Sequence, residues 1–139
     1  MNAIDTNVLI YFIDGDDPVK QKIAIDLLRK LSRSQTQTVL PWQVGVEFLS
    51  CLRRWENAGR TNRADTLRHI RQMETTFEFV FPSRKVLLGS LDISSRHSLS
   101  HWDSLLLAAC VEAGVKTLYS EDLTHGATYD SVKVVNPFI

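Results

Sequence analysis

Four carboxylates spread along this chain each stand beside a strongly apolar segment: Asp5, Glu47, Asp103 and Asp122. Burying an ionised acid without a partner is expensive, so proteins seldom place several of them beside core segments without compensation. A bound divalent cation is the simplest compensation, and ligands made only of oxygen select hard ions such as Mg2+ or Mn2+. The pattern therefore predicts a metal site that draws on these four acids.

A cluster of oxygen ligands suits the hydrolysis of phosphodiester bonds. One ion lowers the pKa of an attacking water, and a second ion, typically about 3.5–4 Å away, stabilises charge on the leaving oxygen. One of the acids can also accept a proton from the water. Thr6 and Ser120 stand close to two of the acids in sequence, where their hydroxyls could position a water molecule. The sequence therefore predicts a metal-dependent nuclease.

Each acid also has a plainer explanation. Asp5 could cap a turn, Asp122 could be an Asx-turn residue, and Asp103 could be a first-turn acid favoured by the helix dipole. Glu47 is the hardest to explain in this way, because it shares a helical face with apolar residues such as Phe48. A shared site is favoured over four separate explanations because all four acids are expected at one edge of a sheet.

The composition is that of an ordinary globular protein. A length of 139 residues predicts a single domain over 1–139 that buries a core without disulfides. The two cysteines lie in apolar helical patterns, which is typical of the reducing cytoplasm. The first residues lack a basic leader, and no apolar run approaches the roughly 18 residues of a membrane span. We expect a cytoplasmic protein with no signal peptide and no contact with a membrane.

Charge is unevenly distributed, although the formal net charge is zero. Residues 48–85 hold eight Arg or Lys against four acids, whereas residues 86–139 hold three against six. The balanced total argues against a nonspecific polyanion binder. A basic middle beside acidic flanks could still hold a phosphate backbone next to a metal site. The alternative is a solvated helix face.

Strand and helix patterns alternate along the chain. A short strand is expected over 3–13, running into a turn at Asp14-Gly15-Asp16 or a brief helix, and further strands are expected at 38–40, 77–81, 116–119 and 132–135. Helices are expected after Asp17-Pro18, from Pro41 to about Gly59, over 62–75, from Pro82-Ser83 through an apolar side with Val86, Leu87 and Leu91, and over 101–113.

This alternation predicts a three-layer α/β/α sandwich with a short, mainly parallel central sheet. Functional sites in such sheets collect at the carboxyl ends of the strands. Asp5 and Asp122 are expected there, and Glu47 and Asp103 are expected in the first two turns of helices that follow connections into the sheet.

Four segments resemble the acidic motifs of PIN-domain proteins, most closely the VapC-type toxins of bacterial toxin–antitoxin pairs: IDTNVLIY (4–11), VEF (46–48), HWDSL (101–105) and LYSEDL (118–123). The resemblance implies a PIN-like fold and Mg2+- or Mn2+-dependent endoribonuclease activity, with Asp5, Glu47, Asp103 and Asp122 as metal-binding acids. Asp5 and Asp103 match the positions most dependably assigned as ligands. Thr124 stands where many members carry a further acid, which leaves occupancy of a second metal site open.

The resemblance also implies a homodimer inhibited by a small, VapB-like antitoxin. The region 41–75 could leave a groove for a partner helix between apolar residues that could equally fill the core: Phe48, Leu52, Trp55, Leu67 and Ile70. Two alternatives remain: an RNA-processing nuclease without an antitoxin, and a non-catalytic RNA-binding or interaction domain. Cleavage of DNA is also open, because no residue visibly reads a 2′-hydroxyl. Acyl transfer, NTP hydrolysis and dinucleotide binding lack their glycine-rich motifs.

Overall fold

A computed structural model describes all residues from Met1 to Ile139. In chain order the elements are β1 (Asn2–Ile4), α1 (Thr6–Ile13), α2 (Pro18–Ser32), β2 (Thr38–Pro41), α3 (Trp42–Asn57), α4 (Arg63–Thr76), β3 (Glu78–Val80), α5 (Lys85–His97), α6 (His101–Ala113), β4 (Thr117–Tyr119), β5 (Thr128–Tyr129) and β6 (Val132–Val135).

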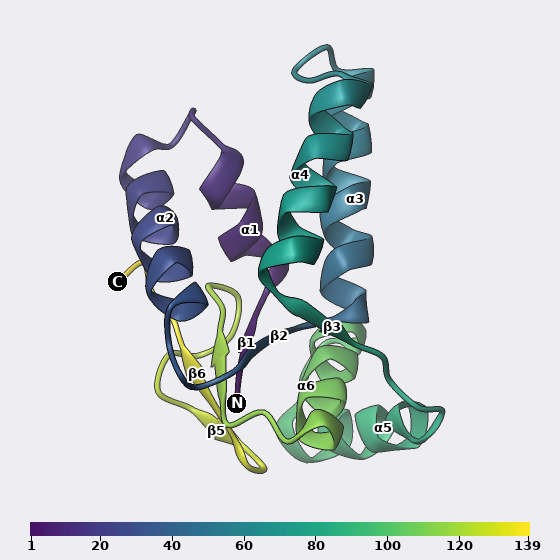
Figure 1. Ribbon diagram of the computed structural model, residues 1–139. Coiled ribbons are helices and arrows are strands. Elements are labelled where there is room, and N and C mark those ends of the chain that lie inside the picture. Colours follow the sequence, from purple (N-terminus) through teal and green to yellow (C-terminus); the bar gives the residue numbers. More distant parts are fainter.

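All strands join one sheet in the order β3-β2-β1-β4-β6-β5, and only β5 runs antiparallel to its neighbour. The chain moves from β1 to β2 to β3 through α1 to α4 and returns to β4 through α5 and α6. Because such crossovers are right-handed as a rule, this reversal of direction assigns the first four helices to one face of the sheet and the last two to the other. Figure 1 shows α5 and α6 together at the opposite side from α1 and α2, while α3 and α4 rise as a pair of adjacent helices. The expected α/β fold with a mainly parallel central sheet is confirmed.

Local sequence signals explain where several helices begin and end. Asp17 accepts a hydrogen bond from the backbone N–H of Lys20 at 3.1 Å, immediately before the proline that opens α2. Ser100 accepts one from the N–H of Asp103 at 3.3 Å and so starts α6. Gly114 ends α6 at a φ of 80°, a conformation that glycine adopts without strain. These boundaries agree with the sequence prediction.

Other details differ from the prediction. Most of the segment 3–13 forms helix α1, because Asp5 caps it directly after a strand of three residues. The short strand β5 was not predicted. On α5 the side chains of Leu87 and Leu91 are each 65% exposed, because Val86, Ser90 and Ile93 form its buried side instead.

The core lies around the central strands. Ala3 and Ile4 of β1, Val39 of β2, Leu118 of β4 and Val134 of β6 are fully buried, as expected for parallel strands covered on both faces. None of the helices is long and apolar enough to cross a membrane.

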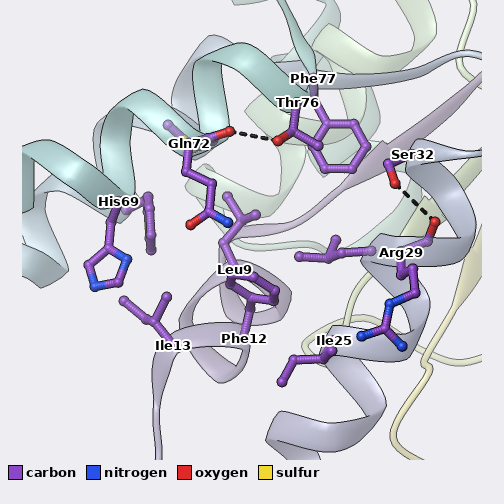
Figure 2. A pocket seen from close by; sticks show the side chains of 13 residues that line it. Leu9, Phe12, Ile13, Ile25, Arg29, Ser32, His69, Gln72, Thr76 and Phe77 are labelled. Atoms are coloured by element: carbon purple, nitrogen blue, oxygen red, sulfur yellow. Dashed lines mark hydrogen bonds between the residues drawn. The ribbon is translucent and has the colours of Figure 1, made fainter.

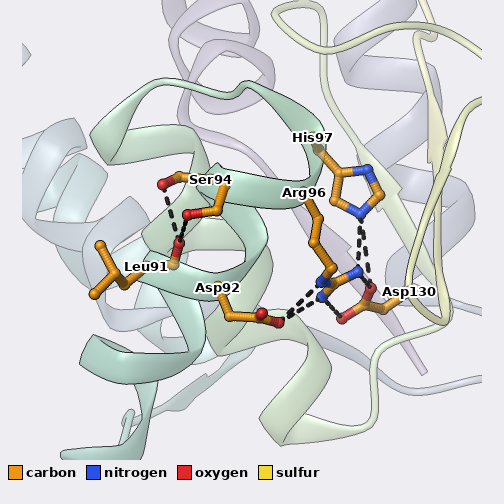
Figure 3. Close-up of polar contacts among 7 residues, drawn as sticks. Leu91, Asp92, Ser94, Arg96, His97 and Asp130 are labelled. Carbon is orange, nitrogen blue, oxygen red and sulfur yellow. Dashed lines mark hydrogen bonds and ion pairs between the residues drawn. The ribbon is translucent and has the colours of Figure 1, made fainter.

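A cluster of ion pairs ties the corner between α5 and α6 to the β5–β6 turn (Figure 3). Arg96, near the end of α5, donates to both carboxylate oxygens of Asp130 at 2.7 and 3.0 Å and also to Asp92. His97 lies 3.7 Å from Asp130. The next residue, Ser98, has a φ of 54° and turns the chain toward α6. The cluster therefore fastens the end of α5 to the β5–β6 turn.

Candidate active site

Asp5 is positioned by the register between β1 and β4. Ile4 pairs with Tyr119, so the residues that follow them, Asp5 and Ser120, leave the sheet side by side. The Ser120 hydroxyl donates to Asp5 Oδ2 at 2.6 Å, and the backbone N–H of Thr6 donates to Asp5 Oδ1 at 2.7 Å. Asp5 therefore both caps α1 and sits at the carboxyl edge of the sheet, where its side chain is only 5% exposed.

Glu47 reaches the same edge from the second turn of α3. Thr6 Oγ1 donates to Glu47 Oε2 at 2.9 Å, and Gln43 Nε2 donates to Glu47 Oε1 at 2.8 Å. Thr6 thus contacts Asp5 through its backbone and Glu47 through its side chain. The two acids, 42 positions apart in sequence, are held on either side of one residue.

Asp122 is joined to Asp5 through Asn7 and Ser120. Asn7 Nδ2 donates to Asp122 Oδ2 at 3.1 Å and lies 3.4 Å from Asp5 Oδ2. The backbone N–H of Asp122 donates to the Ser120 hydroxyl at 3.1 Å. Three of the four predicted acids therefore belong to one hydrogen-bonded group.

Asp103 lies apart from that group. It occupies the first turn of α6, it is half-buried, and its carboxylate forms no hydrogen bond or ion pair within the chain. The connection to the other acids runs through its neighbour, because Gln43 Nε2 also donates to the backbone carbonyl of Trp102 at 3.0 Å. The structure thus links Asp103 to the other acids only indirectly, through Trp102 and Gln43, and its place in a shared site stays a prediction.

Thr6 and Ser120 were predicted to position a water molecule. Their hydroxyls donate to Glu47 and Asp5 and so orient these carboxylates. The positioning of a water molecule by these two residues stays a prediction. Glu121 does not substitute for the acid that Thr124 replaces, because its carboxylate pairs with Lys20.

The electrostatics single out Asp5. Burial raises the pKa of its carboxyl from 3.8 to about 6; the hydrogen bonds from Ser120 and Thr6 oppose this shift, and the negative charges of Asp122 and Glu47 add to it. No Lys, Arg or His forms an ion pair with any of the four acids. A buried carboxylate with two acids nearby and no cation is the setting that a bound cation would stabilise.

The four acids match a divalent ion in the chemistry of their donor atoms. Their oxygen donors are of the kind that Mg2+ and Mn2+ prefer, and no cationic side chain of the protein competes for them. No three acidic, histidine or cysteine side chains are, however, arranged to hold one ion together. The carboxylates of Asp5, Glu47 and Asp122 accept hydrogen bonds from Thr6, Asn7, Ser120 and Gln43 instead. The residues fit the ion in their chemistry, and ion binding would compete with some of these hydrogen bonds.

The basic middle of the sequence falls largely on α3, α4 and the turn between them. Arg60 pairs with Asp14 and Asp16, and Arg63 pairs with Glu56. These guanidinium groups are therefore already neutralised. Others have no acidic partner: Arg53, Arg54, Arg71, Arg84 and Lys85.

Arg54 lies on the same side of α3 as Gln43 and Glu47, seven residues beyond Glu47, and its guanidinium donates to Ser50 at 3.0 Å. That spacing corresponds to a rise of about 10 Å along the helix. A free cationic group therefore lies on the site side of α3, beyond the carboxylates.

Comparison with known proteins identifies the family of this chain. The family model described as "PIN domain" matches residues 3–129. This chain belongs to the PIN-domain family. No curated protein was found to match it in sequence.

Solved structures share the PIN fold of this chain across nearly its whole length. A toxin–antitoxin complex from Klebsiella pneumoniae matches with a TM-score of 0.66 and 18% identity, covering 99% of this chain and 98% of that chain. VapC20 of Mycobacterium tuberculosis, described as a toxin that cleaves the sarcin–ricin loop, matches with a TM-score of 0.68 and 14% identity, covering 88% and 90%. VapBC2 of Rickettsia felis, bound to a promoter DNA fragment, matches with a TM-score of 0.68 and 11% identity, covering 96% of each chain. At these identities the likeness establishes the fold.

Two residues of the candidate site were not predicted from the sequence. Asn7 connects Asp5 with Asp122, and Gln43 connects Glu47 with the start of α6. Asn7 stands within the first acidic motif, which was a signal that could have pointed to it. Gln43 lies one turn before Glu47, and that spacing predicts contact between the two side chains.

Proposed function

We propose that this PIN-domain protein is a Mg2+- or Mn2+-dependent endoribonuclease of the cytoplasm, formed by one nuclease domain over residues 1–139. We further propose that it is the toxin of a toxin–antitoxin pair. The observation that carries the nuclease proposal is the buried Asp5 carboxylate, which has no cationic partner and is joined to Glu47 and Asp122 through single intervening residues.

Asp5, Glu47, Asp103 and Asp122 would hold the ion. When bound, a divalent cation would strengthen a water nucleophile and withdraw charge from the phosphate oxygens. The protein's own groups prepare this edge: Ser120 and Thr6 orient Asp5 and Glu47, and Asn7 keeps Asp122 beside Asp5. Asp103 has a carboxylate free of internal hydrogen bonds and is the acid most available for a new ligand.

An RNA substrate is supported by the positive charge of Arg54, which lies further along α3 than Glu47. Arg54 presents an unpaired guanidinium on the side of α3 that carries Glu47. A phosphate backbone running from the carboxylates along α3 would meet this cation. One of the structures with this fold, VapC20, is itself described as a toxin that cleaves the sarcin–ricin loop.

The nuclease is tested by incubating purified protein with total RNA and mapping the cut ends, with Mg2+, Mn2+ or EDTA. We expect cleavage that EDTA abolishes and that Asp5→Asn or Asp103→Asn removes without unfolding the protein, because a neutral amide is a poor ligand for Mg2+. Either variant cutting as fast as the parent would refute the assignment of that acid. Absence of heat or stabilisation on Mn2+ titration would favour a non-catalytic domain.

An antitoxin partner is supported by a cavity of about 410 Å³ between α4 and the α1–α2 pair (Figure 2). Apolar side chains form most of its lining, among them Leu9, Phe12, Ile25 and Met73, and His69 lies at its edge. Such a cavity suits the apolar face of a partner helix. The sequence had suggested a groove within the region 41–75, but most of the lining comes from α1, α2 and α4. Of the five apolar residues predicted to border a groove, only Phe48 lines this cavity.

The partner proposal can be tested by co-expression with any short reading frame adjacent to the gene. Ile25→Arg should prevent co-purification of that second protein, because it places a charge in the apolar cavity. Asp5→Asn should leave co-purification intact. Loss of the partner with Asp5→Asn alone would place the contact elsewhere, and absence of any adjacent partner gene would favour an RNA-processing nuclease.

We also propose a homodimer, which is supported by an apolar stripe on the outer side of α3. Trp42, Val46 and Leu49 are 47%, 50% and 40% exposed and recur at a spacing that places them on one face. Phe81 extends the stripe, since its ring centroid lies 5.3 Å from that of Trp42. Exposed apolar stripes of this kind mark association surfaces.

The dimer is tested by measuring mass in solution. Val46→Glu should convert a dimeric parent into a monomer because it buries a charge in the interface. Val19→Glu is the matched control, because Val19 on α2 is 71% exposed and lies outside the stripe. A monomeric parent at tens of micromolar, or equal disruption by both variants, would refute this interface.

A further inference from the structure

Gln43 occupies a bridging position between two elements that carry candidate ligands. It lies in the first turn of α3, and its single amide nitrogen donates to Glu47 Oε1 at 2.8 Å and to the backbone carbonyl of Trp102 at 3.0 Å. Trp102 immediately precedes Asp103 in α6. Both N–H groups of the amide are therefore used, one on each side of the site.

No other hydrogen bond joins α3 to α6. The alternative is that Gln43 and Glu47 form an ordinary pair four residues apart on a helix surface, which contributes only about 0.2–0.5 kcal/mol to helix stability. Such a pair does not require a second acceptor on another helix. The contact with Trp102 is what links the geometry of Glu47 to the start of α6.

The chemistry of the donor matters as much as its position. Thr6 Oγ1 donates to the other oxygen of Glu47, so both carboxylate oxygens are oriented by neutral groups. A lysine or arginine in the place of Gln43 would orient the carboxylate but would also neutralise it and repel a cation. A neutral amide holds Glu47 in place and leaves its negative charge available.

We infer that Gln43 is a positioning residue that holds Glu47 in register with Asp103, so that the two acids can serve one divalent cation. This inference rests on the proposed metal-dependent function. Removing groups that orient metal ligands typically weakens metal affinity about 10- to 100-fold. Loss of the Gln43 amide should therefore lower affinity for Mn2+ while the fold is retained.

The test compares Gln43→Met with the parent by calorimetric titration of Mn2+ into metal-free protein. We expect a dissociation constant weakened about tenfold, with the thermal midpoint in EDTA unchanged within a few degrees. RNA cleavage at low Mn2+ should fall in proportion and should recover largely when Mn2+ is raised. A purely structural role would lower the midpoint in EDTA and would not respond to added Mn2+.

Gln37 provides a matched control. Its Nε2 donates to Glu78 Oε2 at 3.0 Å, so it forms the same kind of amide–carboxylate contact, but Gln37 precedes β2 and Glu78 begins β3 at the amino edge of the sheet. Gln37→Met should bind Mn2+ like the parent. If Gln43→Met binds Mn2+ within about twofold of the parent, or if Gln37→Met weakens binding equally, the inference is wrong.

Asp5→Asn, titrated beside them, distinguishes an error in the proposed metal site from an error in the role assigned to Gln43. If Asp5→Asn binds Mn2+ as tightly as the parent, the proposed metal site itself is wrong. If Asp5→Asn loses Mn2+ binding while Gln43→Met retains it, the metal site stands and only the role of Gln43 is refuted.

Discussion

Replacing Asp5 by Asn should make the metal-free protein more stable at neutral pH, even though it removes a proposed ligand. Burial raises the pKa of the Asp5 carboxyl from 3.8 to about 6. One pKa unit corresponds to about 1.4 kcal/mol, so the ionised carboxylate lowers the free energy of unfolding by about 3 kcal/mol at about pH 7. Asn keeps an oxygen for the Thr6 N–H but turns an amide toward the Ser120 hydroxyl and the Asn7 amide, which costs about 1–2 kcal/mol. The net gain should be about 1–2 kcal/mol.

The sign of the pH dependence follows from the higher pKa in the folded state. Between about pH 4 and 6 the folded protein binds more protons at Asp5 than the unfolded chain does. This contribution to stability is therefore present at low pH, is lost as the pH rises through that window, and stays lost above it. From about pH 4.5 to about pH 7 the parent should lose about 2 kcal/mol relative to Asp5→Asn, whose residue 5 does not titrate.

Urea unfolding of both proteins in EDTA at the two pH values measures this effect. Taking the difference between parent and variant cancels most of the titration of the other acids and histidines. Saturating Mn2+ at about pH 7 should then reverse the order of stability, because binding at about 100 times the dissociation constant adds about 2.7 kcal/mol to the parent only. A parent–variant difference that is the same at both pH values, or a parent that is the more stable one in EDTA at neutral pH, would refute the reasoning.

Two further predictions concern packing and charge. Gly45→Ala should destabilise the protein by about 1 kcal/mol, because the added Cβ would lie 2.6 Å from the Phe79 ring. Gly89→Ala should stabilise it by up to about 1 kcal/mol, since its nearest neighbour would be at an ordinary 3.7 Å, and chemical unfolding of both variants checks the opposite signs. Arg54→Ala should weaken RNA binding and reduce the slope of log affinity against log salt by about 1, whereas Arg71→Ala, on the exposed face of α4, should leave both unchanged in filter binding.

The sequence was sufficient to predict most of the elements because their local signals are strong. Asp17-Pro18 and Ser100 start helices as predicted, and Gly114 ends one. The apolar residues between 8 and 13 could not be resolved in the same way, because a continuous apolar run fits a buried strand as well as a buried helix. The segment forms a helix because the Asp5 side chain caps its first turn.

The exposed side of α5 shows a second limit of prediction from the sequence. Its sequence carries apolar residues on both faces, so periodicity alone does not say which side packs. The contact is decided by size: Gly89 lies against Ala108 of α6, and this close approach leaves Leu88 and Leu91 outside at 77% and 65% exposure. Which face of α5 is buried therefore depends on the partner helix and cannot be predicted from the sequence of α5 alone.

The candidate site shows the same division between local and tertiary information. Four acids at the ends of strands and the starts of helices could be predicted from a parallel α/β pattern. The contacts that join them could not, because Asn7 reaches Asp122 across 115 positions and Gln43 reaches Trp102 across 59. The register of β1 against β4 creates the first contact, and the packing of α3 near α6 creates the second.

The charge at Asp5 is the part of this site that stability alone does not explain. As an N-cap the residue contributes about 1 kcal/mol, and Asn caps a helix as well as Asp does. The ionised form costs about 3 kcal/mol at its buried position in the absence of a cation. A residue chosen only to start α1 would therefore be neutral. An acid at this point is consistent with a folded protein that becomes fully stable when a cation binds, and the reversal of stability with Mn2+ tests that interpretation directly.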